Sequence, residues 1–432
     1  MTNIDQKEVL LRVEDLCQYF KLGPGRELKA VNHVSFDIKK GEVFGLVGES
    51  GCGKTTTGRS IIKLYDITGG SVYFKGERIA AGIRSYQDAI KEAKKNAADR
   101  LAELAAELQS HPDKAEEIQA KTLEVKANLA DEIAKQKAAM ASAKFDHKNC
   151  DKMHRKRLLA ALAEEYQPKI DELQQHIAEG GNQSLADELS SLKKEYAEKR
   201  RLARGERLTT QIQMIFQDPI SSLDPRMTVS EIIAEGLQIK GIRDKKYIKE
   251  QVYKALEQVS LVREHAERYP HEFSGGQRQR IGIARSIVMQ PELIIADEPI
   301  SALDVSIQAQ VINLLNELRE KLNLTILFIA HDLSVVKYFS DRIGVMYFGN
   351  MVELATSDEL FAHPLHPYTK SLLSAIPLPD PHYEKQRKRV VYNPLAEHDY
   401  SKQQPTMREV EPGHFVLCND EEYERYLQEV KK

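Results

Sequence analysis

The sequence predicts an α/β fold with a mostly parallel central sheet, interrupted by a long helical insertion. Continuous apolar runs at 43–47, 293–296 and 325–330 are typical of strands buried on both faces, and helical patterns lie between them. Residues 9–38 alternate apolar and polar side chains, as half-buried antiparallel strands do. From about residue 85 to 205, Ala, Glu, Lys, Leu and Gln dominate and form narrow apolar stripes that suit helix-on-helix packing.

Composition places limits on what the protein contacts. A net charge of -3 over 432 residues gives no general attraction to nucleic acid, so we expect no nucleic-acid partner. The cysteines form no Cys-x-x-Cys pair, which indicates a reducing compartment without a structural metal. Residues 1–8 contain no apolar segment typical of a signal peptide. No apolar run reaches the roughly 18 to 20 residues that span a bilayer, so other chains would have to supply any membrane-spanning helices.

We expect the insertion to be an antiparallel helical hairpin or small bundle. Breaks are predicted near 110–113, 145–151 and 180–182, where Pro, Gly or polar residues interrupt the stripes. The insertion enters after a predicted strand at 71–74 and leaves before another at 211–214, so we expect both ends in the peripheral antiparallel part. The predicted units are a first core part at 1–84, the insertion at 85–205, a second core part at 206–340 and a C-terminal extension at 341–432.

A glycine-rich loop after the first buried strand carries the main chemical signal. Its sequence, Gly-Glu-Ser-Gly-Cys-Gly-Lys-Thr, satisfies the phosphate-loop pattern in the required strand-to-helix context. Backbone N–H groups would converge on phosphate oxygens at the helix start, Lys54 would reach the β- and γ-phosphates, and Thr55 would hold Mg²⁺. The residues predicted to bind ATP here are Gly48, Glu49, Ser50, Gly51, Cys52, Gly53, Lys54, Thr55 and Thr56.

Two further patterns suit ATP hydrolysis. Asp297 and Glu298 end the buried strand at 293–296, and ligands of such sheets bind at the carboxyl ends of strands. Asp297 would join the Mg²⁺ shell and Glu298 would act as general base on water, although such a pair is often only a solvated turn. Ser274 with two glycines at a helix start forms a second candidate phosphate-binding segment. A chain that binds one nucleotide does not need two such segments for it.

The segment 273–277 resembles the signature sequence of ABC ATPases, with Phe273 where Leu is more usual. The resemblance covers roughly 9–84 and 206–380. It implies an ABC cassette with a mixed parallel core, an antiparallel β-subdomain and a helical signature subdomain. Two such cassettes would dimerise head to tail, so that the signature of one covers ATP held by the other. The residues implied to act across the dimer are Phe273, Ser274, Gly275, Gly276, Gln277 and Asp304.

The same resemblance assigns the remaining site residues. Gln217 matches the Q-loop glutamine, which contacts Mg²⁺ and the attacking water. His331 matches the switch histidine, which contacts the γ-phosphate; a lone histidine is more often a surface or core residue, so only its place after a buried strand supports this. Phe20 matches the aromatic residue that stacks on adenine. Tyr19 is the competing choice, and either ring could instead be a core aromatic.

More narrowly, 213–229 and 363–373 resemble the oligopeptide and dipeptide importer subfamily. That resemblance implies an ATP-hydrolysing subunit on the cytoplasmic face of the membrane. Its implied partners are a homologous ATPase subunit (heterodimer favoured, homodimer possible), two membrane-spanning permease subunits that dock at 218–241, and an extracytoplasmic solute-binding protein. Several members hold an iron–sulfur cluster with four C-terminal cysteines; here that region has only Cys418, so we expect no cluster.

Two minor sequence patterns are explained without a further binding site. His363 and His366 have a spacing that could bind a metal, but the prolines between them favour an extended docking loop. The basic run at 385–389 is expected to be solvated surface rather than a nucleic-acid patch.

Three alternative functions share features with this sequence. DNA-maintenance ABC ATPases also contain a coiled coil, but theirs follows the Q-loop, whereas this insertion ends before Gln217. Translation-associated ABC proteins carry two cassettes, and this chain has one. An ABC importer for another solute, such as nickel, stays open.

Overall fold

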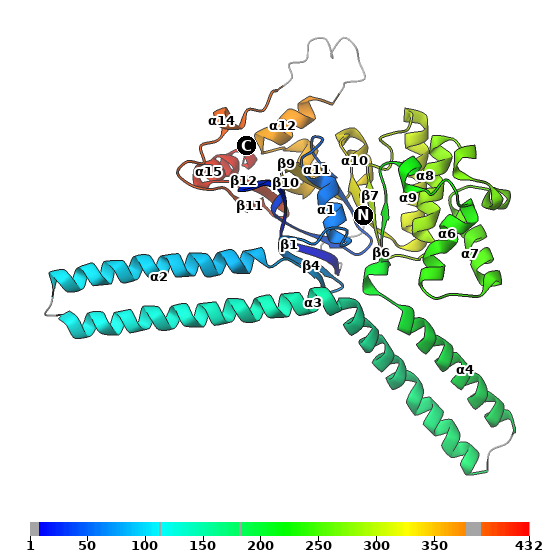
Figure 1. The fold of residues 1–432 in the computed structure, drawn as a ribbon. Coiled ribbons are helices and arrows are strands. Elements are labelled where there is room, and N and C mark those ends of the chain that lie inside the picture. Colours follow the sequence, from blue (N-terminus) through cyan, green and yellow to red (C-terminus); the bar gives the residue numbers. More distant parts are fainter. Residues whose placement is uncertain (1–7, 112–113, 181–182, 377–389, 432) are drawn as a thin grey trace, which may run out of the picture.

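The computed structural model describes residues 8–111, 114–180, 183–376 and 390–431, which form two sheets, surrounding helices and two long helical arms (Figure 1). A four-stranded antiparallel sheet has the order β2-β1-β4-β5. Its strands are β1 (Val9–Gly23), β2 (Arg26–Lys39), β4 (Gly69–Phe74) and β5 (Glu77–Ala81). The predicted antiparallel strands at 9–38 are therefore confirmed.

The main sheet has eight strands in the order β11-β12-β10-β9-β3-β8-β7-β6. Strands β9, β3, β8, β7 and β6 run parallel, and the remaining three pair antiparallel. Every residue of β3, β7 and β8 is buried, as the apolar runs predicted. The bounds are β3 (Val43–Val47), β6 (Ile212–Ile215), β7 (Leu293–Asp297), β8 (Thr325–Ile329), β9 (Arg342–Tyr347), β10 (Asn350–Thr356), β11 (Thr406–Glu411) and β12 (His414–Cys418). The predicted α/β cassette fold is confirmed.

The central strands separate two apolar clusters. Ile294 and Ile326 join the cluster that includes residues of α6, α7, α8 and α9, whereas Ile295 and Leu327 join the cluster under the antiparallel sheet, because successive side chains of a strand point to opposite faces. The core helices are α1 (Lys54–Ile61), α5 (Pro219–Ser222), α6 (Val229–Ile239), α7 (Lys245–Gln258), α8 (Gly275–Ile287), α9 (Val305–Leu322) and α10 (Leu333–Phe339), with the 3₁₀ turns η3 (Leu208–Gln211), η4 (Arg263–Glu267) and η5 (Pro270–Glu272).

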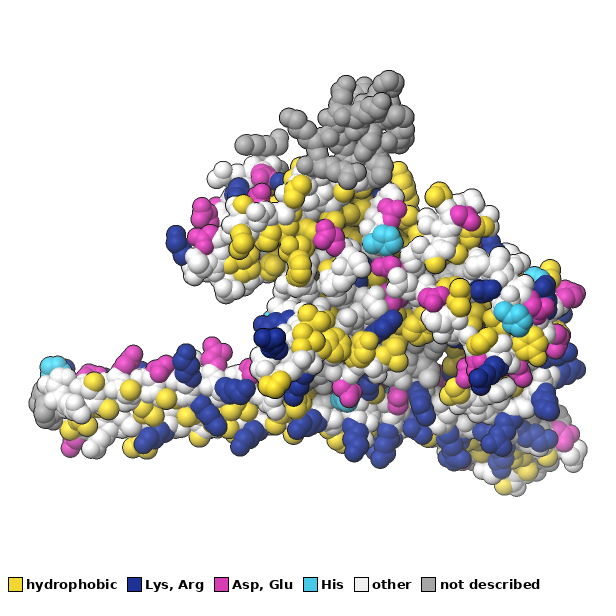
Figure 2. All heavy atoms as spheres, turned by 45° about the horizontal axis from the view of Figure 1, so that its top comes forward, with side chains coloured by type: hydrophobic (Ala, Val, Ile, Leu, Met, Phe, Trp, Pro, Cys, Tyr) yellow, Lys and Arg dark blue, Asp and Glu magenta, His cyan; other side chains and the backbone are white. Residues whose placement is uncertain are grey.

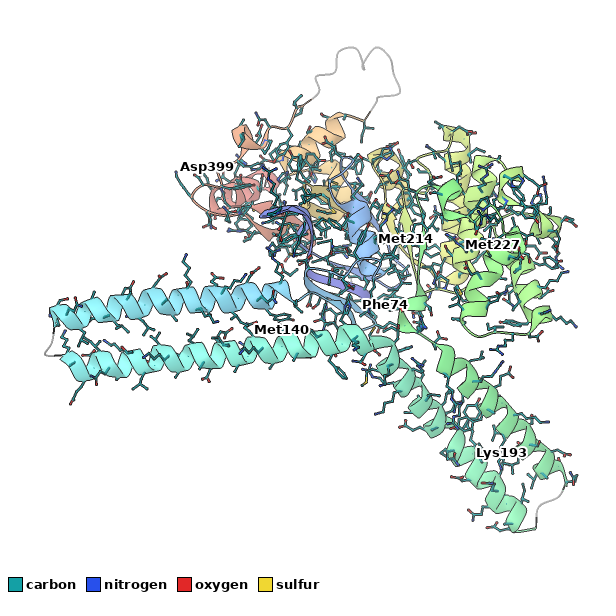
Figure 3. All side chains as sticks on the ribbon, viewed as in Figure 1. Phe74, Met140, Lys193, Met214, Met227 and Asp399 are labelled. Atoms are coloured by element: carbon teal, nitrogen blue, oxygen red, sulfur yellow. The ribbon has the colours of Figure 1, made fainter. Side chains whose placement is uncertain are left out.

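The insertion consists of α2 (Arg84–Ser110), α3 (Ala115–Ala178) and α4 (Gln183–Gly205). It forms two arms: α2 with the N-terminal half of α3, and the C-terminal half of α3 with α4 (Figure 1). We call these the first arm and the second arm. Met140 lies on the first and Lys193 on the second, away from Met214 of β6 (Figure 3).

The predicted break at 145–151 was wrong, because α3 continues through it. This segment lies across β5 and is tied to the cassette there. Arg78 pairs with Asp146 at 2.6 Å, Lys63 donates to the carbonyl oxygen of His147 at 2.8 Å, and Cys150 is buried in the apolar cluster. Side chains that looked like a polar interruption in sequence instead dock the middle of a continuous helix.

The expected position of the insertion's ends was half wrong. The entry follows β5 of the antiparallel sheet, but α4 leads through η3 into β6, an edge strand of the main sheet. Ile212 pairs in parallel with Leu293 of β7 and is itself buried, so four residues were enough for a sheet strand. The exit is also packed: a side chain at Gly205 would lie 2.6 Å from the carbonyl oxygen of Lys240, and Lys240 pairs with Glu206.

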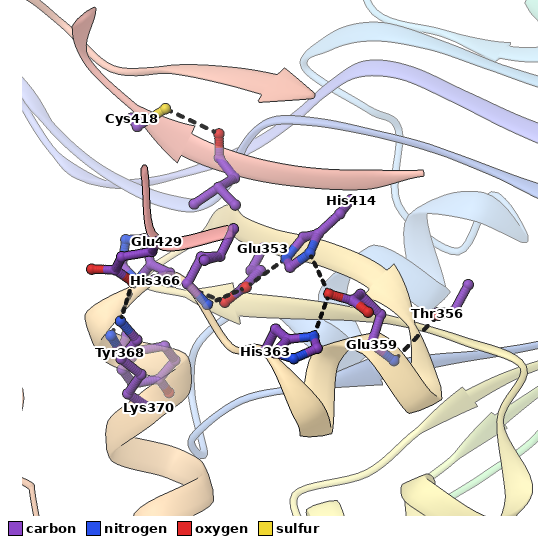
Figure 4. Close-up of polar contacts among 12 residues, drawn as sticks. Glu353, Thr356, Glu359, His363, His366, Tyr368, Lys370, His414, Cys418 and Glu429 are labelled. Atoms are coloured by element: carbon purple, nitrogen blue, oxygen red, sulfur yellow. Dashed lines mark hydrogen bonds and ion pairs between the residues drawn. The ribbon is translucent and has the colours of Figure 1, made fainter. Parts of the chain in front are cut away.

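The C-terminal part adds strands β11 and β12 to the edge of the main sheet, with α11 (Ser357–Ala362), α12 (Pro367–Ser374), α14 (Pro394–Glu397) and α15 (Asp420–Val430) around them. Glu353, fully buried in β10, holds this part together (Figure 4). Its carboxylate accepts from the backbone N–H groups of Leu365 (2.8 Å) and His366 (3.1 Å) and contacts His414 Nε2 at 2.8 Å.

Residues 363–366 form the expected loop, between α11 and α12, but part of it is packed inside the chain. His366 is 1% exposed and caps α12, where its Nδ1 accepts from the N–H of Tyr368. His363 is exposed and contacts Glu359 (Figure 4). The basic run at 385–389 lies outside the described residues. Among the helices that the structure does describe, none has the length and apolar composition needed to cross a bilayer.

Candidate active site

The predicted catalytic residues follow the carboxyl ends of adjacent parallel strands. Gln217 comes two residues after β6, Glu298 directly after β7 and His331 two residues after β8. The phosphate loop follows β3, which pairs with β8. The strand order β3-β8-β7-β6 thus brings four distant chain segments to one edge of the sheet, which is where open α/β sheets bind ligands.

Glu298 is the meeting point of these segments. Its Oε2 accepts from Gln217 Nε2 at 2.9 Å and lies 3.3 Å from His331 Nδ1. The side chain of Glu298 is 13% exposed and that of His331 is 55% exposed, so the carboxylate is sheltered while the imidazole faces solvent. Glu298 also has φ 43°, a left-handed conformation that is costly for a non-glycine residue and concentrates at functional sites.

The phosphate loop depends on glycine where it lies against the neighbouring backbone. Gly53 has φ 110°, and a Cβ there would lie 2.2 Å from the carbonyl oxygen of Ala30. Lys54 begins α1 and is buried, and its Nζ donates to the carbonyl oxygens of Gly48 (2.7 Å) and Glu49 (2.9 Å). The ammonium group is therefore enclosed by the loop that precedes it.

Thr55 and Asp297 suit a small divalent cation. Thr55 Oγ1 donates to Asp297 Oδ1 at 2.7 Å, and Asp297 is fully buried. Its Oδ2 has no hydrogen-bond partner among the described residues, so one buried carboxylate oxygen is left for another ligand. Burial raises the pKa of Asp297, opposed by the hydrogen bond from Thr55. Hydroxyl and carboxylate oxygens are donors that Mg²⁺ prefers, so the residues fit that ion.

Two aromatic residues compete for the adenine role. Tyr19 OH donates to Asn32 Oδ1 at 2.6 Å, and Arg84 lies over its ring. Phe20 has no such polar tie and meets Tyr65 edge to face with ring centroids 5.4 Å apart. The adenine-stacking role of Phe20 stays a prediction.

The signature residues lie in the helical part, away from the phosphate loop of the same chain: α8 and α1 are well separated in Figure 1. Ser274 caps α8 and is exposed, forming a capping box with Gln277, whereas Phe273 is buried. A Cβ at Gly276 would lie 2.6 Å from Ile307 Cγ2, so glycine allows α8 to approach α9. Asp304 caps α9 and is also exposed.

Comparison with known proteins agrees with this geometry. The ABC transporter family profile matches residues 31–162 and 156–301. The oligopeptide transport ATP-binding protein OppF of Bacillus subtilis is 45% identical over 420 residues, covering 97% of this chain and 99% of OppF. The chain belongs to the ABC transporter family. A profile of the oligopeptide/dipeptide transporter C-terminal region also matches residues 352–402, which places it among the ATP-binding proteins of that subfamily.

A second relative is similar over nearly its whole length. The dipeptide transport ATP-binding protein DppF of Lactococcus lactis is 40% identical over 420 residues, covering 96% of each chain. Among solved structures, cbiO1 of Clostridium perfringens matches with a TM-score of 0.48 and 18% identity, over 83% of this chain and 92% of cbiO1. The family expected from the signature and the C-terminal motif is confirmed. The chain is an ABC transporter ATPase and binds ATP.

Two residues at this ABC site were not predicted from the sequence. The hydroxyl oxygen of Tyr368, buried on α12, accepts from the backbone N–H of Glu49 at 3.0 Å, which ties the C-terminal part to the phosphate loop. Arg285 of α8 donates to the carbonyl oxygen of Ser222 at 2.6 Å and lies over the ring of Phe216. It thereby links the signature helix to the Q-loop. Both lie in segments whose motifs were recognised, but only tertiary contacts reveal these roles.

Proposed function

We propose that this chain hydrolyses MgATP as one of two cassettes that power the import of oligopeptides or dipeptides. The observation that carries the proposal is the convergence of Gln217 and His331 on a single oxygen of Glu298. That arrangement, beside a phosphate loop, supplies a general base at the place where a γ-phosphate would lie. The names of OppF and DppF support peptides as the transported substrate.

Each residue has a role that its position supports. Lys54 would exchange the carbonyl oxygens of its own loop for the β- and γ-phosphate oxygens. Thr55, Asp297 and Gln217 would hold Mg²⁺, which neutralises developing phosphate charge when bound. Glu298 would accept a proton from the attacking water while His331 contacts the γ-phosphate. Phe20 would stack on adenine.

The second half of each site would come from another cassette. Ser274, Gly275 and Asp304 are exposed at the starts of α8 and α9, which suits contact with ATP held by a partner ATPase subunit, a homologue or a second copy. The segment 218–241 would dock a membrane-spanning permease subunit, and Arg285 would relay its position to the signature helix. A solute-binding protein outside the membrane would complete the transporter.

Turnover in the complete transporter, reconstituted in vesicles, tests the catalytic assignment. Glu298→Gln keeps the shape of the side chain but removes the base, so we expect ATP hydrolysis to fall roughly a hundredfold to ten-thousandfold while ATP still binds. Lys54→Ala should weaken ATP binding as well. Glu320→Gln, an exposed change on α9, is the matched control and should hydrolyse normally. Unchanged peptide-stimulated hydrolysis in Glu298→Gln would refute the role of Glu298.

Ser274→Arg tests the contribution in trans. A bulky cation at the exposed start of α8 should block closure over the partner's nucleotide without affecting the mutant's own phosphate loop. We expect hydrolysis to be lost while equilibrium binding of a fluorescent ATP analogue persists. Joint loss of binding and hydrolysis in a well-folded variant would instead indicate a site formed within one chain.

A further inference from the structure

We propose that Asp15, Cys17 and His33 form a binding site for a zinc-type divalent cation on the paired strands β1 and β2. One donor atom from each side chain lies within 4.8 Å of the other two. Asp15 Oδ1 and His33 Nδ1 are already 2.6 Å apart. In the described part of the chain, no other group of three such side chains brings its donor atoms so close.

The donor set matches the chemistry of zinc. Zinc in proteins is bound by thiolate sulfur, imidazole nitrogen and carboxylate oxygen, and three protein ligands leave one coordination position open. The side chains of His33 and Asp15 are 61% and 51% exposed, so a cation can enter from solvent. Cys17 is only 4% exposed and supplies sulfur from beneath. A cation bound to all three donors would replace the direct contact of Asp15 with His33.

The backbone holds these side chains together before any cation arrives. The pairing of β1 with β2 shifts register on both sides of Leu16, and both Asp15 (φ 52°) and His33 (φ 54°) adopt the left-handed conformation. Non-glycine residues seldom do so without a local reason, and such residues cluster at functional sites. The N–H of Asp15 donates to Ser35 Oγ at 2.8 Å and that of His33 to Cys17 Sγ at 3.4 Å, which fixes the arrangement.

The alternative is a surface ion pair between Asp15 and His33 with a thiol that only fills space below it. An ion pair of that kind makes no use of sulfur, and its behaviour would not change if the thiol became a hydroxyl. A cation site depends on all three side chains. The two readings therefore differ in whether sulfur bonds to added metal, which can be measured directly without nucleotide or membrane subunits.

Cobalt(II) is the probe, because its bond to thiolate gives a charge-transfer absorption band. The purified full-length chain is titrated with Co²⁺ without nucleotide, and Zn²⁺ is then added to displace it. We expect the band in the wild type and its loss in Cys17→Ser, Asp15→Asn and His33→Gly. Glycine and asparagine tolerate the left-handed conformation, so the last two changes should not impair folding. Cys150→Ser, which alters another buried thiol, is the matched control and should keep the band.

Thermal unfolding supplies an independent readout. Zn²⁺ should raise the Tm of the wild type and of Cys150→Ser, because a ligand that binds only the folded state stabilises it, and should leave the Tm of His33→Gly unchanged. No band in the wild type, or a band that persists in Cys17→Ser or His33→Gly, would overturn the proposal. Loss of the band in Cys150→Ser alone would also overturn it, because the sulfur ligand would then be elsewhere.

Discussion

The catalytic edge of the sheet and the helical arms are built by opposite means. At the edge, contacts join residues far apart in sequence, such as Thr55 with Asp297 and Gln217 with Glu298. Many ion pairs along the arms join residues three or four positions apart, such as Glu117 with Lys121. Acidic and basic side chains mix along the first arm, with apolar side chains scattered between them (Figure 2).

The difference in burial explains this contrast. Every residue of β7 is buried, whereas among the 27 residues of α2 only Ala97 and Leu104 are. Tertiary packing specifies side-chain positions at the edge closely, while the arms are held by local helical contacts and narrow stripes. Adding or removing a few atoms in the cassette should therefore have a large effect, whereas the arms should tolerate large changes of sequence.

The largest expected effect comes from one methyl group. Gly53→Ala would place a Cβ 2.2 Å from the carbonyl oxygen of Ala30 at φ 110°, so the phosphate loop must shift and ATP binding should be lost. Gly180 in the second arm has a similar φ of 113° but open space around it. Gly180→Ala is therefore the matched control and should bind ATP normally. Equal ATP affinity in the two variants, measured by fluorescence titration, would break the comparison.

Removing the arms should affect stability but not ATP binding. We expect a short Gly/Ser linker in place of 85–205 to preserve ATP affinity within about twofold, because the insertion does not contribute to the phosphate loop and exposed connections tolerate changes of length. The deletion removes buried Cys150 and the pairing of Arg78 with Asp146, so the Tm should fall. A deletion protein that is folded but cannot bind ATP would show that the arms support the site.

The folded chain should become less stable in acid because of buried His366. Burial, followed by the charges of His398 and Lys370, lowers the pKa of His366 to about 3. At a pH between the ordinary histidine pKa near 6.5 and this lowered pKa, the unfolded chain binds more protons than the folded chain. The free energy of unfolding therefore falls as pH falls, by up to about 1.4 kcal/mol per pH unit. His366→Asn keeps an acceptor at the helix cap but cannot titrate.

Urea unfolding between pH 7 and 5 tests this. The slope of the free energy of unfolding against pH should be smaller in His366→Asn than in the wild type. His363→Asn, at an exposed position three residues earlier, should keep the wild-type slope. Identical slopes for all three proteins would mean that His366 does not stay neutral in the folded state.

The smallest effect is expected within the second arm. Tyr166 OH donates to Glu195 at 2.6 Å and accepts from Lys199, and its ring stacks on Tyr196. Tyr166→Phe removes both hydrogen bonds, so amide hydrogen exchange in α4 should become faster while ATP hydrolysis is unchanged. Tyr196→Phe keeps the stack and both bonds and is the control. A loss of hydrolysis in Tyr166→Phe would show that the arm is coupled to the site.

The same contrast explains what could be predicted from the sequence. The candidate site residues follow strand ends, and strand ends are visible as apolar runs, so Glu298 could be placed at a strand end from the sequence, whereas His331 also needed the resemblance to ABC ATPases. The path of α3 could not, because apolar stripes indicate packing but not the partner; Cys150 carried no sign that it docks on β5. The four-residue strand β6 and the hydrogen bond from Glu49 to Tyr368 also depend on contacts that only the folded chain reveals.

The continuity of α3 has a mechanical consequence. With 64 residues and a rise of about 1.5 Å per residue, its contour is nearly 100 Å. It changes direction between the two arms (Figure 1), and Asp146 and His147 near its middle meet the cassette. It belongs to both arms at once and has no loop between them that could act as a hinge. The directions of the two arms are therefore linked through the bend of one helix rather than through a loop.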